Sequence, residues 1–246
     1  MHRFFVEQEN FSPGQEILLT GEDAHHIFNV LRLVKGEEIS IGSGKGEVYR
    51  ARLETVREGW VKAVLLEQEL DLREPSLSLT LAQGIPKGEK MDNIIRHAVE
   101  LGVSAIIPMR TERTVPRFSA QKGLKKCHRW QKIARSAAAL AKRSVIPKVL
   151  EVSSIGEVLE TAHTYDAVFL PWEEEKENMF RNLIEDKEMA RILLLIGPEG
   201  GFSEHEVENA RKAGAKIVSL GPRIMSSETA ALAAVTILQH VYGDLG

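Results

Sequence analysis

From residue 77 to the end, short apolar runs alternate with segments whose apolar residues recur every three or four positions. The first pattern is typical of buried strands and the second of helices that cover them. Strands that alternate with helices favour a mainly parallel sheet with helices on both faces, an α/β fold. We predict strands at 77–83, 105–109, 148–152, 166–170, 192–196 and 216–220, and helices at 89–101, 121–143, 155–161, 174–184, 204–213 and 227–241.

The first 72 residues have a different pattern, in which strands predominate. A glycine-rich turn at 42–46 separates two of them, which is a hairpin signal. A small β-barrel is the economical way to pair such strands without exposed edges. Since the pattern changes across 71–75, we expect a β domain over 1–72 and an α/β domain over 73–246. The predicted strands of the first domain are 3–6, 16–20, 38–41, 48–55 and 60–66, with one helix at 22–33.

The composition limits the class of protein. Hydrophobic residues make up 43% of the 246 residues, which is enough to form real cores. No stretch approaches the ~18 apolar residues that span a bilayer, and residues 1–7 lack the apolar run of a signal peptide. We therefore expect a soluble, cytoplasmic protein. The single cysteine, Cys127, has no metal-ligand spacing around it, so we expect neither an internal disulfide nor a metal site.

Charge is separated along the chain, although the net charge is only -3. Between residues 110 and 148, twelve basic residues stand against one acidic residue, whereas fifteen acidic residues stand against four basic ones between 151 and 210. A basic block of this kind is the electrostatic footprint expected of a protein that binds a phosphate backbone. The alternative is a solvated helix face, but such faces usually mix both signs. The block favours a nucleic-acid partner.

Two glycine-flanked segments, 193–202 and 220–230, each read as an apolar strand that runs into a tight turn and then a helix. In open α/β sheets, ligands bind at the carboxyl ends of the strands. Glycine lets a ligand approach the main chain closely. The alternative is that Gly and Pro serve only as turn residues in ordinary connections. Two such loops after successive strands favour a site for a flat or charged small molecule.

Several common catalytic motifs are missing. No phosphate-binding glycine motif stands between a predicted strand and a helix, and neither Gly-x-Ser-x-Gly nor His-Glu-x-x-His occurs. These absences leave the hydrolase and zinc-protease classes without support.

Seven segments, spread along the chain, together resemble the RsmE-type ribosomal RNA methyltransferases of the SPOUT superfamily, in that family's order. The segments are 3–6, 26–32, 87–92, 100–103, 111–113, 196–202 and 220–231. The resemblance implies a PUA-like β-barrel followed by a SPOUT-type α/β domain with a C-terminal trefoil knot, and a homodimer. It also implies transfer of a methyl group from S-adenosylmethionine to N3 of a uridine in 16S ribosomal RNA, as naked RNA or in the 30S subunit.

The resemblance also implies site residues. A sulfonium methyl is already electrophilic, so the chemistry requires no metal, and the protein orients cofactor and base. The implied cofactor-binding residues are Leu170, Pro171, Gly197, Pro198, Glu199, Gly200, Gly201, Leu220, Gly221, Ile224 and Met225. The implied RNA-binding residues are Arg3, Arg32, Lys87, Arg110, Arg113, Arg117 and Arg129.

Four residues are candidates for the catalytic step. Uracil N3 must lose its proton, so a nearby base or a cation that stabilises the ring oxygens would help. Arg113 and Arg143 could supply the cation, and Glu199 or Glu228 the carboxylate. The alternatives are that the arginines contact only phosphate and that Glu228 is a carboxylate favoured by a helix start.

The chain departs from the family pattern at three places. Met225-Ser226-Ser227 replaces the usual Leu-Arg-Thr, Ala139-Leu140 replaces a Glu-Gln pair, and Arg96-His97 replaces Gln-Lys. Serine cannot replace the charge or the donors of a guanidinium. Two other hypotheses therefore stay open: an RNA-binding paralogue with weak or altered methyltransferase activity, and a small-molecule enzyme with no RNA partner.

Apolar residues of the segment 227–241 wrap around more than one face of the predicted helix. We expect this helix to be buried on two sides. Either its own subunit or a second copy of the chain could cover the second side.

Overall fold

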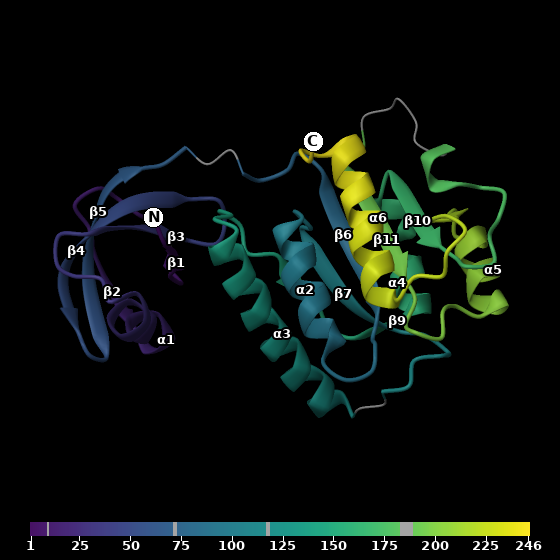
Figure 1. Ribbon diagram of the computed structural model, residues 1–246, viewed down its shortest axis with the longest axis horizontal. Helices are drawn as coiled ribbons and strands as arrows, with labels where there is room; N and C mark the ends of the chain where they lie inside the picture. The colour runs from purple at the N-terminus through teal and green to yellow at the C-terminus, as the bar shows by residue number, and fades with distance from the viewer. Residues whose placement is uncertain (9, 71–72, 117–118, 183–188) are drawn as a thin grey trace. The chain divides into compact units, whose positions relative to one another are not determined.

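The computed structural model describes residues 1–8, 10–70, 73–116, 119–182 and 189–246 (Figure 1). The chain folds as two compact units. The first comprises Met1–Glu74 and Ala138–Ile146, and the second comprises Pro75–Ala137 and Pro147–Gly246. Residues 138–146 thus belong to the first unit, although the sequence pattern places most of them in a helix of the α/β part.

The first unit is built on a five-stranded sheet in the order β1-β3-β4-β5-β2. Its strands are β1 (Arg3–Phe5), β2 (Glu16–Thr20), β3 (Glu38–Gly42), β4 (Val48–Arg57) and β5 (Trp60–Gln68). Strand β1 pairs with β3 in parallel and the other neighbours are antiparallel. Along β2 exposed and buried residues alternate, so one face of the strand packs on the core. The predicted strands are confirmed, with ends shifted by one or two residues.

The predicted helix at 22–33 is shorter and of two kinds. An α-helix, α1 (Gly21–His25), continues directly into a π-helix, η1 (His26–Leu31). The helical run ends at Arg32, which has left-handed backbone with φ of 53°. The wider π turn is a feature that the apolar spacing alone does not distinguish from an α-helix.

A buried ion pair holds residues 138–146 within the first unit. The Arg143 side chain is 4% exposed, and its Nη2 donates to Glu74 Oε2 at 2.7 Å. The backbone N–H groups of Ser144 and Val145 also donate to Glu74 Oε1, at 2.8 and 3.0 Å. One carboxylate therefore fixes the turn that follows the long helix of the second unit.

The second unit contains the predicted parallel sheet, in the order β12-β10-β11-β6-β7-β8, with β9 beside β7 (Figure 1). All its described pairs are parallel. The strands in the middle, such as β6 and β11, are buried along nearly their whole length, as expected when helices cover both faces. The strands are β6 (Ser78–Gly84), β7 (Ala105–Arg110), β8 (Lys148–Val149), β9 (Ser153–Ser154), β10 (Ala167–Pro171), β11 (Arg191–Ile196) and β12 (Lys216–Val218).

Five α-helices accompany this sheet in the ranges described above, and five of the six helix predictions are confirmed. Helices α4 and α5 both begin with a capping box, formed by Ser154 with Glu157 and by Ser203 with Glu206. Within the described ranges, none of the helices is long and apolar enough to cross a membrane. The helices are α2 (Lys90–Glu100), α3 (Ala120–Leu140), α4 (Ile155–Glu160), α5 (Glu204–Lys212) and α6 (Ser227–Tyr242).

Two predictions in this unit are wrong. The strand predicted at 148–152 is split into the two short strands β8 and β9. The helix predicted at 174–184 is absent from 174–182, where only a 3₁₀ turn, Phe180–Asn182, occurs; residues 183–184 lie outside the described ranges. The Glu175 carboxylate accepts the N–H groups of Glu177 and Asn178, and Phe180 donates its N–H to Ser219. These bonds satisfy the backbone without a helix.

Helix α6 has two apolar faces. Ala231, Ala234, Val235 and Leu238 are buried against the rest of the second unit. A second stripe is only half-buried in the single chain. It consists of Ala230, Ala233, Ile237 and Val241. The expected two-sided burial is therefore complete on one side and partial on the other.

Candidate functional site

A cleft of about 340 Å³ lies at the carboxyl ends of β10, β11 and β12. Ligands of open α/β sheets bind at this edge, and the volume lies in the range of small-molecule sites. Nine of the predicted cofactor-binding residues line it: Pro171, Gly197, Pro198, Glu199, Gly201, Leu220, Gly221, Ile224 and Met225. Leu170 is wholly buried beneath the cleft and Gly200 faces Arg113, so these two do not line it.

The loop at 197–201 is a tight turn closed by the Gly201 N–H, which donates to the Pro198 carbonyl at 2.9 Å. Gly201 has a φ of +65°, and a Cβ on it would lie 2.3 Å from Glu173 Oε1. The left-handed backbone conformation therefore favours glycine, and any side chain here would have to displace the Glu173 carboxylate. Glu173 also lines the cleft, next to Gly201.

The second loop, at 220–226, offers unused donors and an apolar surface. Within the described part of the chain, the backbone N–H groups of Leu220, Ile224 and Met225 have no hydrogen-bond partner. The Ile224 side chain is 91% exposed at the cleft. In the facing wall the buried Nε1 of Trp172 also lacks a partner among the described residues. A flat, hydrogen-bonding ring such as a nucleoside base fits such a combination of apolar and donor groups.

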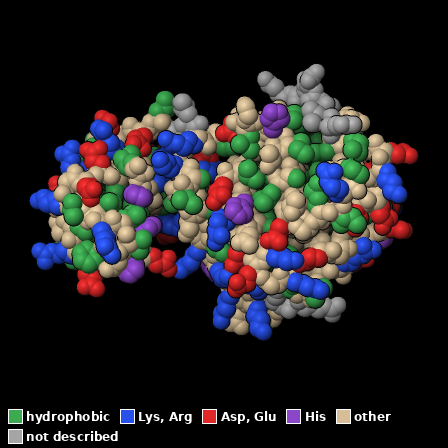
Figure 2. All heavy atoms as spheres, viewed as in Figure 1, with side chains coloured by type: hydrophobic (Ala, Val, Ile, Leu, Met, Phe, Trp, Pro, Cys, Tyr) green, Lys and Arg blue, Asp and Glu red, His purple; other side chains and the backbone are tan. Residues whose placement is uncertain are grey.

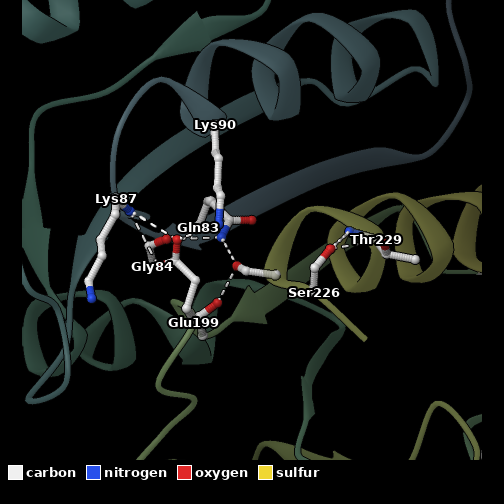
Figure 3. Close-up of polar contacts among 9 residues, drawn as sticks. Gln83, Gly84, Lys87, Lys90, Glu199, Ser226 and Thr229 are labelled. Carbon is white, nitrogen blue, oxygen red and sulfur yellow. Dashed lines mark hydrogen bonds and ion pairs between the residues drawn. The ribbon is translucent and has the colours of Figure 1, made fainter. Parts of the chain in front are cut away.

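Glu199 is held in the cleft by two residues that precede or begin α2 (Figure 3). Lys90 Nζ donates to Glu199 Oε1 at 2.8 Å, and the Lys87 N–H donates to both carboxylate oxygens at 3.2 and 3.3 Å. Partial burial opposes ionisation, but the hydrogen bonds from Lys90 and Lys87 outweigh it, and the pKa of Glu199 lies below its ordinary value. Glu199 is therefore an anion at neutral pH.

Arg113 lies beside the same loop. Its Nη1 donates to the Gly200 carbonyl at 2.8 Å. The preceding residue, Glu112, donates its N–H to Glu206 Oε1 at 2.8 Å, while Glu206 Oε2 accepts the Ser203 N–H. The capping box of α5 thus also fixes the backbone that carries Arg113. Arg113 is exposed, and its guanidinium lies next to the cleft rather than in its lining.

The other two catalytic candidates lie in different surroundings. Glu228 is half-buried in the first turn of α6, and its charge adds to that of Glu199 in raising the pKa of Lys90. Arg143 belongs to the first unit, where its guanidinium pairs with Glu74. The structure does not place Arg143 among the residues of the cleft.

The predicted RNA-binding residues differ in exposure. Arg32, Lys87 and Arg110 are exposed. Arg3 is 6% exposed and bonds to Ser40 and to the Lys142 carbonyl.

Arg129 and Arg117 complete this set. Arg129 is exposed and pairs with Asp92 and Glu89. Arg117 lies outside the described residues.

Basic side chains are grouped near the start of α3. Lys122 and Lys125 are exposed there. Figure 2 shows Lys and Arg side chains gathered over this part of the second unit, with some acidic side chains beside them. The charged block that the sequence indicates is therefore a surface feature, at least along the described part of this helix.

Sequence reasoning missed part of the cleft. Five lining residues lie within the glycine-flanked segments 193–202 and 220–230 but are not among the implied cofactor-binding residues: Ile196, Phe202, Arg223, Ser227 and Ala230. Trp172, Glu173 and Ser219 carried no sequence signal of their own, because they reach the cleft only through the ends of β10 and β12. Ser226, noted only as a departure from the family pattern, also lines the cleft.

The departures have structural roles that can be described. Ser226 caps α6: its hydroxyl accepts the Thr229 N–H at 3.2 Å (Figure 3). Arg96 and His97 lie on the exposed side of α2, where His97 contacts Glu100. Leu140 is 74% exposed.

Ala139 precedes Leu140 in the segment that belongs to the first unit.

Groups of three or more His, Cys, Asp or Glu side chains able to hold a metal ion do not occur in the described ranges.

Two protein families match the sequence. Residues 73–239 match the family described as RNA methyltransferase domain, and residues 19–65 match the RNA methyltransferase PUA domain. The first match spans most of the second unit, and the second match lies within the first unit.

Several relatives match along nearly the whole chain. A ribosomal RNA small subunit methyltransferase E from Bacillus subtilis is 32% identical over 247 residues, covering 98% of this chain and 96% of the relative. The same-named protein of Synechocystis is 35% identical over 216 residues, covering 87% and 69%.

Solved structures agree with these matches. The ribosomal RNA small subunit methyltransferase E of Neisseria gonorrhoeae, bound to S-adenosyl methionine, superposes with a TM-score of 0.91 at 33% identity and 100% coverage of both chains. A Legionella pneumophila protein in complex with the bound cofactor SAM gives 0.91 at 31% identity, with 99% and 98% coverage.

Proposed function

This chain belongs to the ribosomal RNA small subunit methyltransferase E family, and on that premise we propose that it transfers the methyl group of S-adenosylmethionine to N3 of a uridine in 16S ribosomal RNA. The observation that carries the proposal is the cleft between residues 197–201 and 220–226, which combines an apolar wall with unused backbone donors. Two structural relatives contain S-adenosylmethionine. A PUA-like domain precedes the catalytic unit, as expected of a protein that acts on RNA.

The residues of the cleft suit the parts of this cofactor. Leu220, Ile224 and Met225 would hold the adenine ring through their side chains and backbone N–H groups. The carboxyl groups of Glu173 and Glu199 line the same space, and the anionic Glu199 favours a positively charged ligand. When bound, the cofactor supplies a methyl group on an electrophilic sulfonium, so the protein has to position it and the base.

We assign Arg113 to the stabilisation of the uracil ring. Deprotonation of N3 places negative charge on the ring oxygens, and a guanidinium beside the cleft lowers the cost of that charge. Hydrogen bonding to Gly200 and the anchored backbone of Glu112 hold Arg113 in place. Glu199 is a weak base because Lys90 and Lys87 stabilise its anion, so we assign it to positioning the loop.

Arg143 has a different task in this proposal. Its guanidinium is buried on Glu74 within the first unit, so we assign it to folding rather than to methyl transfer. The catalytic role of Glu228 remains a prediction. Its position in the first turn of α6 also suits a carboxylate that the helix dipole stabilises.

We propose that exposed basic side chains bind the phosphates of 16S ribosomal RNA or of the 30S subunit in the cytoplasm. Arg32, Lys87 and Arg110 point to solvent and Lys122 and Lys125 extend the set along α3. Arg3 is omitted because its guanidinium is used inside the first unit. Such contacts position RNA without reading its sequence.

We also propose a homodimer, with the half-buried stripe of α6 as part of the contact. Small and branched apolar residues at Ala230, Ala233, Ile237 and Val241 would be covered by a second copy. Sedimentation of the chain should give twice the monomer mass, and Ile237→Asp should give monomers. The trefoil knot implied by the family resemblance stays a prediction.

The test of the proposed function is methyl transfer. The chain, labelled S-adenosylmethionine and 30S subunits that lack the modification should yield N3-methyluridine at one position of 16S ribosomal RNA, identified by mass spectrometry of the digested RNA. A product methylated on another atom, or cofactor binding without transfer, would contradict the proposal.

One observation favours a second candidate, a paralogue with weak activity. Ser226 lines the cleft as an uncharged helix cap, where the family pattern has arginine. If turnover is limited by this loss, Ser226→Arg should raise the rate of methyl transfer at saturating cofactor. A high rate of methyl transfer by the unmodified chain, with no increase in Ser226→Arg, would refute this candidate.

A further inference from the structure

A buried amide lies beneath the cleft, at the end of β6. Gln83 is 0% exposed, and its Nε2 donates to the Gly84 carbonyl and to Ser227 Oγ, both at 2.9 Å. The Ser227 hydroxyl in turn donates to the Gly197 carbonyl at 2.5 Å. Because a hydroxyl has a single proton, Ser227 can only accept from Gln83, and this fixes the orientation of the amide. Figure 3 shows Gln83 and Gly84 close to Glu199.

This hydrogen-bond chain joins three elements where they meet. Gln83 is the second-to-last residue of β6, Ser227 begins α6, and Gly197 begins the loop that follows β11. Gly197 and Ser227 line the cleft, whereas Gln83 does not. Gln83 can therefore influence a ligand in the cleft only through the groups to which it bonds.

An amide at this position is costly for folding alone. Gln83 follows the wholly buried Leu81 and Ala82 on a strand of the central sheet. Its Oε1 is buried and has no hydrogen-bond partner among the described residues. An unpaired buried carbonyl opposes folding, and an apolar side chain of the same size would avoid that cost. What separates Gln83 from a purely structural amide is its hydrogen bond to Ser227, a residue that lines the cleft.

We propose that Gln83 is a positioning residue for the cofactor cleft, acting through Ser227 on the Gly197 carbonyl and thereby on the loop at 197–201 and the start of α6. This inference rests on the proposed function, because it assumes that the cleft binds S-adenosylmethionine. It goes further in naming a residue outside the cleft on which cofactor affinity depends.

The structure provides a matched control at the other end of α6. Gln239 is also 0% exposed, its Nε2 also donates to a backbone carbonyl, that of Gly102 at 2.9 Å, and its Oε1 is also unpaired among the described residues. It does not line the cleft or bond to a residue that does. Gln83→Met and Gln239→Met therefore make the same chemical change at two buried sites.

The experiment measures S-adenosylmethionine binding by calorimetry and methyl transfer by the unmodified chain and the variants. Gln83→Met should weaken binding about tenfold, the effect of losing one hydrogen bond of ordinary net strength. The KM for the cofactor should rise equally, with kcat at saturation nearly unchanged. Gln239→Met should leave both affinity and KM unchanged, and thermal unfolding checks that both variants are folded.

Ser227→Ala tests the same chain of bonds without altering the sheet, so it remains informative if Gln83→Met folds poorly. It should weaken binding as Gln83→Met does. The double variant should bind the cofactor about as tightly as either single variant, because both substitutions break the same chain of hydrogen bonds. Additive losses, unchanged affinity in Gln83→Met and Ser227→Ala, or an equal loss in Gln239→Met would overturn the inference. Absence of cofactor binding by the unmodified chain would refute the proposed function, and the inference with it.

Discussion

Replacing Gly84 by alanine is expected to displace the cofactor loop. Gly84 ends β6, and its backbone lies directly against the peptide between Gly197 and Pro198. A Cβ on Gly84 would lie 2.5 Å from the Pro198 nitrogen, 2.6 Å from Pro198 Cδ and 2.8 Å from the Gly197 carbonyl carbon. These are backbone and ring atoms, so rotation of a flexible side chain cannot relieve the contact. Gly84 does not have a positive φ, so the effect is steric alone.

The size of the displacement follows from the distances. To move from 2.5 Å to the 3.4 Å of ordinary contact, the Pro198 nitrogen has to shift by about 0.9 Å. A misplacement of about 1 Å in a catalytic site can cost about 100-fold in rate. Overpacking of this kind also lowers the free energy of unfolding by about 1–3 kcal/mol. We therefore expect Gly84→Ala to remain folded, to bind S-adenosylmethionine more weakly and to transfer the methyl group about 100-fold more slowly.

Gly156→Ala is the matched control. The nearest atom to a Cβ on Gly156 is Ser154 Oγ at 3.9 Å, and the residue lies in α4. Alanine there should leave cofactor affinity unchanged and raise helix stability by about 0.5–1 kcal/mol. Calorimetry and urea unfolding measure both quantities on both variants. Unaltered cofactor affinity in a folded Gly84→Ala protein would refute the assignment of the loop at 197–201 to the cofactor.

Three further perturbations test other parts of the account. Glu199→Gln should lower the free energy of unfolding by less than about 1 kcal/mol. The pKa of Glu199 in the folded chain is lowered from 4.5, so the difference in free energy of unfolding between the variant and the unmodified chain should be largest above pH 4.5. This difference should disappear as the pH falls through the lower pKa of the folded chain, as unfolding measured at a series of acid pH values will show. Glu74→Ala removes the carboxylate that pairs with the buried Arg143 guanidinium and should cost about 3 kcal/mol in urea unfolding, whereas Arg52→Ala, at an exposed ion pair, should cost under about 1 kcal/mol. Together, Lys122→Ala and Lys125→Ala should reduce the slope of log affinity for RNA against log salt by about two in filter binding, and an unchanged slope would remove α3 from the proposed RNA surface.

Much of the fold could be predicted because the period of apolar residues reports burial directly. Strands such as β11 are buried on both faces and read as continuous apolar runs, and α2 has its apolar residues at helical spacing. The two glycine loops were located because they follow such strands. The cleft between them is a consequence of the parallel sheet, which brings the carboxyl ends of β11 and β12 to one edge.

The remaining features depend on contacts that are distant in sequence. The segment at 174–182 forms no helix because Glu175 and the backbone near Ser219 satisfy its N–H groups. Residues 138–146 join the first unit because Glu74 accepts donors from them. Similarly, Trp172 and Glu173 reach the cleft only after β10 is placed beside β11 and β12. No local pattern reports such partners.

A crystal structure of the chain with S-adenosylmethionine tests the central claim most directly. The account predicts that the nucleoside lies between residues 197–201 and 220–226, with its adenine ring against Leu220, Ile224 and Met225. Electron density for the cofactor at any other place, or none in crystals soaked to saturation, would contradict it.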